Sequence, residues 1–213
     1  MGLRLALLAV LTTTATWAQT WEVYPVAGYL RLSKKAIGSP NFSDPETADT
    51  SLHSLQPAYG LRLALNTSDY YGLEAHYLRS KARLDTRLIP ADATARVPQS
   101  GNLWLNQLGV NGVSYFMPRR SRFRPFMTAG FHVANFGKPR IADFPERSSR
   151  KLGLNYGGGV KIRLFQNVRF RIDVRDIITG APYDLQTSAS GTSLSSVGRF
   201  RQLEGTVGIG FTF

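Results

Sequence analysis

The chain has 213 residues, and its 26 lysines and arginines outnumber its 14 aspartates and glutamates, which gives a formal net charge of +12. It has no cysteine, which excludes a disulfide framework, and His53, His76 and His132 do not share the spacing of metal ligands. We therefore expect no metal site and no cofactor. The basic charge would suit nucleic acid, but the amino-terminal segment predicts export, so a nucleic-acid partner is not expected.

Residues 1–18 predict a cleaved secretory signal peptide. A single early charge, Arg4, precedes an apolar run up to Leu11, and Thr16 and Ala18 are small residues at the positions that a signal peptidase reads. The run is too short to span a membrane as a helix, which disfavours the alternative of a membrane anchor. We expect cleavage after Ala18 and a mature chain, residues 19–213, that forms one domain.

The mature chain contains eight segments in which apolar and polar residues alternate, the pattern of a strand with one apolar and one polar face. In chain order they are residues 21–33, 56–65, 70–80, 102–116, 125–136, 152–165, 168–177 and 203–213. No stretch approaches the roughly 18–20 consecutive apolar residues of a spanning helix. Only helices and closed barrels satisfy their backbone groups in lipid, so such strands in a membrane must close into a barrel.

The connections between these segments alternate between short and long. The short ones are residues 66–69, 117–124 and 165–167, and the long ones are residues 34–55, 81–101, 137–151 and 178–200. This rhythm is typical of an up-and-down barrel with both termini at the periplasmic rim. The predicted fold is therefore all-β, an eight-stranded antiparallel up-and-down transmembrane β-barrel over residues 19–213.

The last segment shows the alternation most strictly. Its apolar face carries Leu203, Val207, Ile209, Phe211 and Phe213, and glycines and threonines occupy most of the other face. The chain therefore ends in an amphipathic strand whose last residue, Phe213, carries an aromatic side chain and the terminal carboxylate.

Four parts of the chain carry a resemblance to a known family. They are the closing Phe213 and residues 124–131, 155–160 and 169–176. On these the chain resembles the OmpA-type and OmpW-type small bacterial outer-membrane β-barrels. The resemblance implies a monomer in the outer membrane, surrounded by membrane lipids and lipopolysaccharide. It also implies that Phe211 and Phe213 belong to the signal read by the barrel-assembly machinery.

The polar faces of the segments predict a charged lumen, since an eight-stranded barrel is just wide enough for side chains to fill. Buried charges must be paired or they cost several kcal/mol each. We predict a polar network made by Glu74, Lys161, Arg171, Asp173, Arg175 and Glu204. Arg163 and Arg169, which flank a turn, are expected to stay hydrated. The network would be either a plug that specifies the closed barrel or an anion-selective path.

The run Gly157-Gly158-Gly159 lies inside a strand with no helix after it, so it is not a phosphate loop. Folding the hairpin at 165–167 places Gly157 and Gly159 opposite Arg175 and Asp173, or one register along. The absent side chains would then make room for the long arginines. We expect Gly159→Val to destabilise the barrel.

Four arginines crowd the short connection at 117–124, namely Arg119, Arg120, Arg122 and Arg124. One interpretation is a solvated basic turn that contacts inner-leaflet head groups. The other is docking to peptidoglycan or to an acidic periplasmic partner.

The fold also occurs in lipid A deacylases and palmitoyl transferases, and the deacylase needs a histidine and a serine close together. His132 is followed by Val133, Ala134 and Asn135, and no serine is placed to complete a triad with His76. We therefore expect no catalytic residue. The leading function is structural or surface-interactive, and an OmpW-like conduit for small or hydrophobic solutes is the alternative. A lipid A-modifying enzyme and a soluble lipocalin-like barrel are remoter alternatives.

Overall fold

The computed structural model describes residues 19–33, 51–52, 55–88, 97–141, 148–183 and 199–213. The predicted signal peptide and most of the predicted connections 34–55 and 178–200 lie outside the described residues. The strands are β1 (Thr20–Leu32), β2 (Ser51–Leu52), β3 (Leu55–Asn66), β4 (Tyr71–Leu88), β5 (Val97–Tyr115), β6 (Phe123–Phe136), β7 (Ser149–Arg163), β8 (Val168–Thr179) and β9 (Phe200–Thr212). No helix in this part of the chain is long and apolar enough to cross a membrane.

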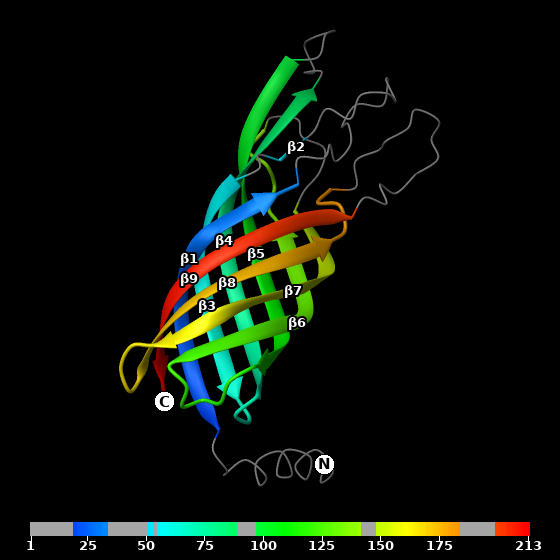
Figure 1. The fold of residues 1–213 in the computed structure, drawn as a ribbon. Coiled ribbons are helices and arrows are strands. Elements are labelled where there is room, and N and C mark those ends of the chain that lie inside the picture. Colours follow the sequence, from blue (N-terminus) through cyan, green and yellow to red (C-terminus); the bar gives the residue numbers. More distant parts are fainter. Residues whose placement is uncertain (1–18, 34–50, 53–54, 89–96, 142–147, 184–198) are drawn as a thin grey trace, which may run out of the picture.

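Eight antiparallel strands form a closed ring within the described residues, which confirms the predicted fold. The order around the barrel is β4, β3, β1, β9, β8, β7, β6 and β5, and a β4–β5 pairing closes it (Figure 1). The first and last long strands meet along one seam, where Val23 lies opposite Phe211. Closure leaves no free sheet edge in the wall, which is what a barrel in lipid requires.

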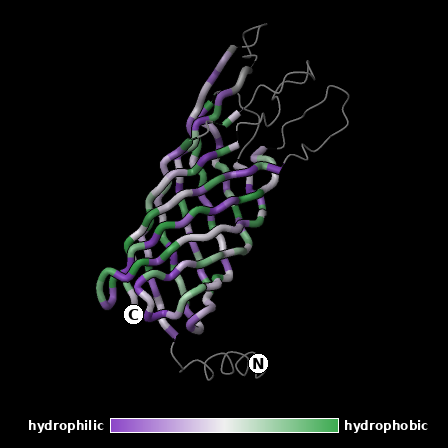
Figure 2. The backbone as a smooth tube through the Cα atoms, viewed as in Figure 1, coloured by the Kyte–Doolittle hydropathy of each residue, from purple (hydrophilic) through white to green (hydrophobic). Residues whose placement is uncertain are grey.

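The alternation of apolar and polar residues in the sequence corresponds to the outer and inner faces of the barrel wall. Figure 2 shows hydrophobic and hydrophilic residues following one another along the strands. On β4, for example, Glu74 and His76 are buried inside the barrel, whereas Tyr77 and Leu73 are exposed on the outer wall. Because successive side chains of a strand point to opposite faces, one apolar and one polar surface arise from a single pattern.

The largest departure from the prediction is the connection at 81–101. Most of it is strand, because β4 continues to Leu88 and β5 already begins at Val97, so that this hairpin extends beyond the other strands at the end away from the carboxyl terminus (Figure 1). The hairpin also pairs with the two-residue strand β2. Ala82 and Leu84 are buried whereas Lys81 and Arg83 are exposed, so the period-2 alternation continues past the predicted strand end at Ser80.

An apolar cap fills the barrel at the end of the long hairpin. Its buried side chains include Leu30, Leu32, Leu84, Leu103, Leu105, Phe136, Tyr183 and Phe200. Phe136 and Phe200 pack edge to face with ring centroids 6.0 Å apart, and Tyr183 donates a hydrogen bond of 2.6 Å to the carbonyl oxygen of Gly137. The cap separates the charged part of the lumen from the loop end of the barrel.

Candidate functional site

The centre of the barrel holds six buried charged side chains. They are Arg62 of β3, Glu74 of β4, Arg171, Asp173 and Arg175 of β8, and Glu204 of β9. Three are cations and three are anions, so the formal charges of this central cluster balance. Such a balance is what allows charges to remain in an interior that water does not reach.

Arg62 connects the three acidic residues from one side. Its Nη1 lies 3.3 Å from the Oε1 of Glu74, and its Nη2 lies 3.1 Å from the Oδ1 of Asp173. The same Nη2 also contacts the carboxylate of Glu204 and donates a 2.8 Å hydrogen bond to the Oγ1 of Thr206. Arg62 therefore ties β3 to β4, β8 and β9.

The two arginines of β8 pair with two of the three acidic residues, Asp173 and Glu74. The Nε of Arg171 lies 2.7 Å from the Oδ2 of Asp173, and the Nε of Arg175 lies 3.2 Å from its Oδ1. Both guanidinium groups also pair with the carboxylate of Glu74. Glu74 thus faces three arginines, and no other acid of the central cluster except Asp173 has as many partners.

Glycines on the neighbouring strand give these long side chains room. Gly157 of β7 lies opposite Arg175 and Gly159 opposite Asp173, which is the first of the two registers that the sequence allowed. A Cβ built on Gly157 would lie 2.9 Å from the Cγ of Arg175, and one on Gly159 would lie 2.6 Å from the Cβ of Asp173. These positions therefore need glycine because another backbone approaches closely, and not for its conformational freedom.

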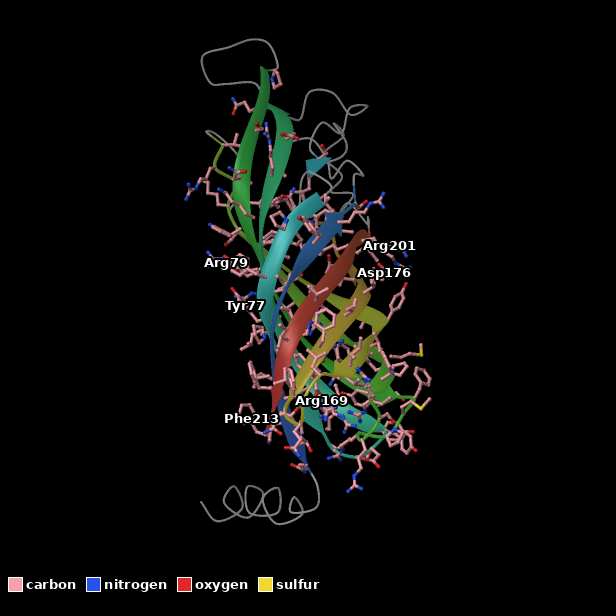
Figure 3. All side chains as sticks on the ribbon, turned by 60° about the vertical axis from the view of Figure 1, so that its left-hand side comes forward. Tyr77, Arg79, Arg169, Asp176, Arg201 and Phe213 are labelled. Carbon is pink, nitrogen blue, oxygen red and sulfur yellow. The ribbon has the colours of Figure 1, made fainter. Side chains whose placement is uncertain are left out.

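A second charged layer lies between the central cluster and the turn end of the barrel. The Nζ of Lys161 contacts the carboxylate of Glu22 and donates a 2.8 Å hydrogen bond to the hydroxyl of Tyr115. The Nε of Arg169 lies 3.3 Å from the Oε1 of Glu22, and Tyr24 donates a 2.9 Å hydrogen bond to the other oxygen. Arg169 lies near the Phe213 end of the barrel in Figure 3.

A neutral polar layer lies between the central cluster and the apolar cap. The rings of His76 and His132 stack with centroids 5.8 Å apart, and the amide of Gln107 donates a 2.6 Å hydrogen bond to Gln202. His76 Nε2 and both ring nitrogens of His132 have no hydrogen-bond partner within the part of the chain that is described. Among those same residues, no group of three histidine, aspartate, glutamate or cysteine side chains could hold a metal ion.

The structure brings five of the six predicted lumen residues into one cluster, Glu74, Arg171, Asp173, Arg175 and Glu204. Lys161 is buried but belongs to the second layer. Arg62 is the member that the sequence prediction lacks. Its place on the polar face of segment 56–65 was the signal that could have identified it.

Of the two expectations about arginines near the turns, one is wrong and the other holds only in part. Arg169 is not hydrated at the rim, since it is only 7% exposed and its guanidinium reaches inward to Glu22. The connection at 117–124 agrees in part with the interpretation as a solvated basic turn, since Arg120 and Arg122 are exposed. Arg124 is buried inside the barrel, donates a 3.0 Å hydrogen bond to Asn66 and lies over the ring of Tyr115, and Arg119 lies 3.5 Å from Asp69. Lumen acceptors at the ends of neighbouring strands attract these long side chains.

The two residues of the predicted assembly signal lie on the seam between β1 and β9. Phe213 donates a backbone hydrogen bond of 2.9 Å to Trp21 and accepts one of 3.2 Å from it. The side chains of Phe211 and Phe213 are exposed on the outer wall, Phe213 by 77%. Their outward placement leaves both rings accessible from outside the barrel.

The outer wall carries an apolar band bordered by aromatic residues. At the turn end these include Trp21, Tyr71, Phe116, Phe123 and Phe211, and toward the loop end Tyr29, Tyr59 and Tyr77, all of them exposed. Aromatic residues at two levels around an apolar band are typical of barrels that span an outer membrane.

Comparison with known proteins agrees with this architecture. A family model described as the outer membrane protein beta-barrel domain matches residues 5–200, whereas no curated protein matches the sequence. The amino-terminal β-barrel domain of OprF from Pseudomonas aeruginosa superimposes with a TM-score of 0.53 at 12% identity, over 91% of this chain and 97% of that one. Neisserial surface protein A (NspA) superimposes with a TM-score of 0.55 at 14% identity, also over 91% and 97%. At such identities the likeness concerns the fold.

Proposed function

This chain belongs to the outer membrane protein beta-barrel domain family, and from that premise we propose that it is a structural barrel that presents surface segments and catalyses no reaction. The family and the closed barrel place it in the outer membrane. A fold of this kind serves many functions, so the proposal rests on the lumen and not on the family alone.

The central cluster is the observation that carries the proposal. Arg62, Arg171 and Arg175 are each at most 1% exposed, and their guanidinium groups meet the acids in the middle of the barrel. The apolar cap lies on one side of the cluster and the Lys161–Glu22 layer on the other. A lumen occupied at these successive levels supports a rigid wall that holds its loops in place, and it disfavours a continuous aqueous path.

The buried histidines support the absence of catalysis. A general base must be reached by the group that it deprotonates. His76 and His132 are only 3% and 1% exposed, and the Nδ1 of His76 faces the Nη1 of Arg175 at 3.2 Å. This burial disfavours either histidine as the base of an acyl-transfer site.

Ion conductance across a planar bilayer tests the proposal. We expect the reconstituted protein to show no steady conductance, and we expect the same for Glu204→Gln, because the remaining members of the central cluster still fill the lumen. Liposome swelling with small sugars provides a second readout.

The opposite result would favour the conduit for small or hydrophobic solutes. A steady conductance in the unmodified protein, with an ion selectivity that changes in Glu204→Gln, would overturn the structural role. Heat-modifiable gel mobility checks that both proteins are folded, because an intact membrane barrel migrates anomalously before heating.

The barrel-assembly machinery is the partner proposed for the carboxyl-terminal strand. We expect Phe213→Ala to lower the amount of folded protein in the outer membrane severalfold, measured by heat-modifiable mobility of membrane fractions. The stability of the protein that does fold should change by less than about 1 kcal/mol, since the Phe213 ring is 77% exposed. Leu203→Ala, at the other end of the same strand, is the control. Equal membrane levels of Phe213→Ala and the unmodified protein would refute the assembly role.

A further inference from the structure

A small groove lies on the outer wall where the β4–β5 hairpin leaves the barrel. Its volume is about 160 Å³, and its cationic side chains are Lys81 of β4 and Lys138 and Arg140 of the segment that follows β6. Asn102 and Trp104 of β5 complete its lining, together with Leu103 and Gly137. The groove therefore joins three stretches of chain that lie far apart in the sequence.

Backbone hydrogen bonds hold the walls of this groove together. The amide of Gly137 donates to the carbonyl of Trp104 at 2.8 Å, and the amide of Arg140 donates to the carbonyl of Asn102 at 3.0 Å. These bonds continue the β5–β6 pairing beyond Phe136, so Lys138 and Arg140 are placed by the sheet and not by a free loop. The guanidinium of Arg79 lies 4.1 Å from the centre of the Trp104 ring, and this cation–π contact helps to hold the Trp104 side chain in place.

Within the described residues, no acidic side chain balances the charge of the groove. Lys81, Lys138 and Arg140 form no ion pair with any of the described residues, and no acidic side chain lines the groove. Arg83, two residues beyond Lys81, differs in this respect, because its Nε lies 3.2 Å from Asp85 and its Nη2 2.8 Å from Ser100. Three cations that have no ionic partner in the described part of the chain surround one small cavity, and such a group attracts a compact anion with more than one negative charge.

The height of the groove along the barrel axis indicates which anion is available to it. Going up the outer wall along β4, exposed Tyr77 at the border of the apolar band is followed by Arg79, and Lys81 comes next on the same face. Figure 3 shows Arg79 above Tyr77, toward the end away from Phe213. The longer connections of outer-membrane barrels are extracellular, so the groove lies at the level of the outer-leaflet head groups.

We propose that this groove binds a phosphate group of the phosphorylated glycolipid that forms the outer leaflet. Arg140 offers a planar fork suited to phosphate oxygens, and the two lysines add point charges. Trp104 has an apolar body and a polar N–H, a combination suited to the boundary between acyl chains and head groups. The inference rests on the proposed outer-membrane location.

Binding of lipid A by the whole protein in detergent, followed by native mass spectrometry, tests this site. The probes are bis-phosphorylated lipid A, lipid A with both phosphates removed, and phosphatidylglycerol. We expect the unmodified protein to prefer bis-phosphorylated lipid A over both other lipids. The triple variant Lys81→Gln, Lys138→Gln and Arg140→Gln should bind it about a hundredfold more weakly, at about 1 kcal/mol per charge.

Two control variants separate the groove from general charge effects. Arg83→Gln removes a charge from the same hairpin, but one that Asp85 already pairs, and Arg120→Gln with Arg122→Gln removes two charges at the opposite end of the barrel. Both should bind lipid A like the unmodified protein. Heat-modifiable mobility must show that each variant is folded.

Several results would overturn the site. They are equal binding by the triple variant and the unmodified protein, an equal loss in either control, and equal binding of dephosphorylated lipid A. Competition by inositol hexakisphosphate as effective as that by lipid A would instead indicate a site for soluble anions and would overturn the lipid assignment. Conductance and membrane fractionation do not depend on the groove, so the proposed function and the phosphate site can fail separately.

Discussion

Replacing Glu74 with glutamine is expected to lower the free energy of unfolding by about 3–5 kcal/mol, because removing one partner of a buried ion pair leaves the other charge uncompensated. Glu74 faces Arg62, Arg171 and Arg175, and each of these side chains is at most 1% exposed. Glutamine keeps the shape of the side chain but supplies no negative charge, so the central cluster would carry an excess positive charge. Urea unfolding in lipid vesicles, followed by tryptophan fluorescence, measures the loss.

The control for this variant is Asp85→Asn on the exposed part of the hairpin. Asp85 pairs with Arg83 at 3.2 Å, but both side chains are about half exposed, and such pairs contribute about 0–1 kcal/mol. A second test combines Glu74→Gln with Arg171→Met, which removes one charge of each sign. The double variant should be more stable than Glu74→Gln alone. A loss below 1 kcal/mol in Glu74→Gln, or no recovery in the double variant, would contradict the role of the central cluster.

Replacing Gly159 with valine is expected to destabilise the barrel by about 3 kcal/mol, the upper range for overpacking. A Cβ at this position would lie 2.2 Å from the carbonyl oxygen of Ile172 and 2.6 Å from the Cβ of Asp173. Neither atom can move away without disturbing the β7–β8 pairing or the central cluster. The thermal unfolding temperature, read from heat-modifiable mobility, should fall.

Gly205→Ala provides a matched control for Gly159→Val. Gly205 also lies within a barrel strand, but no heavy atom is found within 4 Å of a Cβ built on it. Alanine there should be neutral or stabilise by about 0.4–1 kcal/mol, because it restricts the unfolded chain. If Gly159→Val left the unfolding temperature unchanged, or if both variants behaved alike, the close-approach explanation for Gly159 would be wrong.

The eight barrel strands could be predicted because their signal is local. Each strand buries one face in the lumen, so apolar and polar residues must alternate along it, and this alternation is visible without knowing any partner strand. The same argument identified Glu74, Arg171, Asp173, Arg175 and Glu204 as lumen residues. The short turn at 165–167 limited the β7–β8 pairing to two neighbouring registers, and the structure has the one that places Gly157 and Gly159 opposite Arg175 and Asp173.

The partners within the lumen could not be predicted in the same way. Arg62 is the hub of the central cluster because its side chain reaches acids on β8 and β9, two strands that do not pair with β3, an arrangement that depends on the stagger of the strands. The burial of Arg124 and Arg169 likewise depends on acceptors from distant segments, Asn66 and Glu22. Proximity in the sequence to a turn therefore predicted hydration where the structure has a buried hydrogen bond for Arg124 and an ion pair for Arg169.

The sequence by itself determined that the chain alternates as a barrel wall must, which residues face inward, and that the lumen would be charged. Only the tertiary structure decided that Glu74 meets three arginines, that Lys161 belongs to a separate layer, and that Lys81, Lys138 and Arg140 surround one groove. The physical reason is that the direction of a side chain is a local property, whereas its contacts depend on segments far away in the sequence. The direction of a side chain follows from its own strand, whereas its neighbours follow from the register of strands that closing the ring brings together.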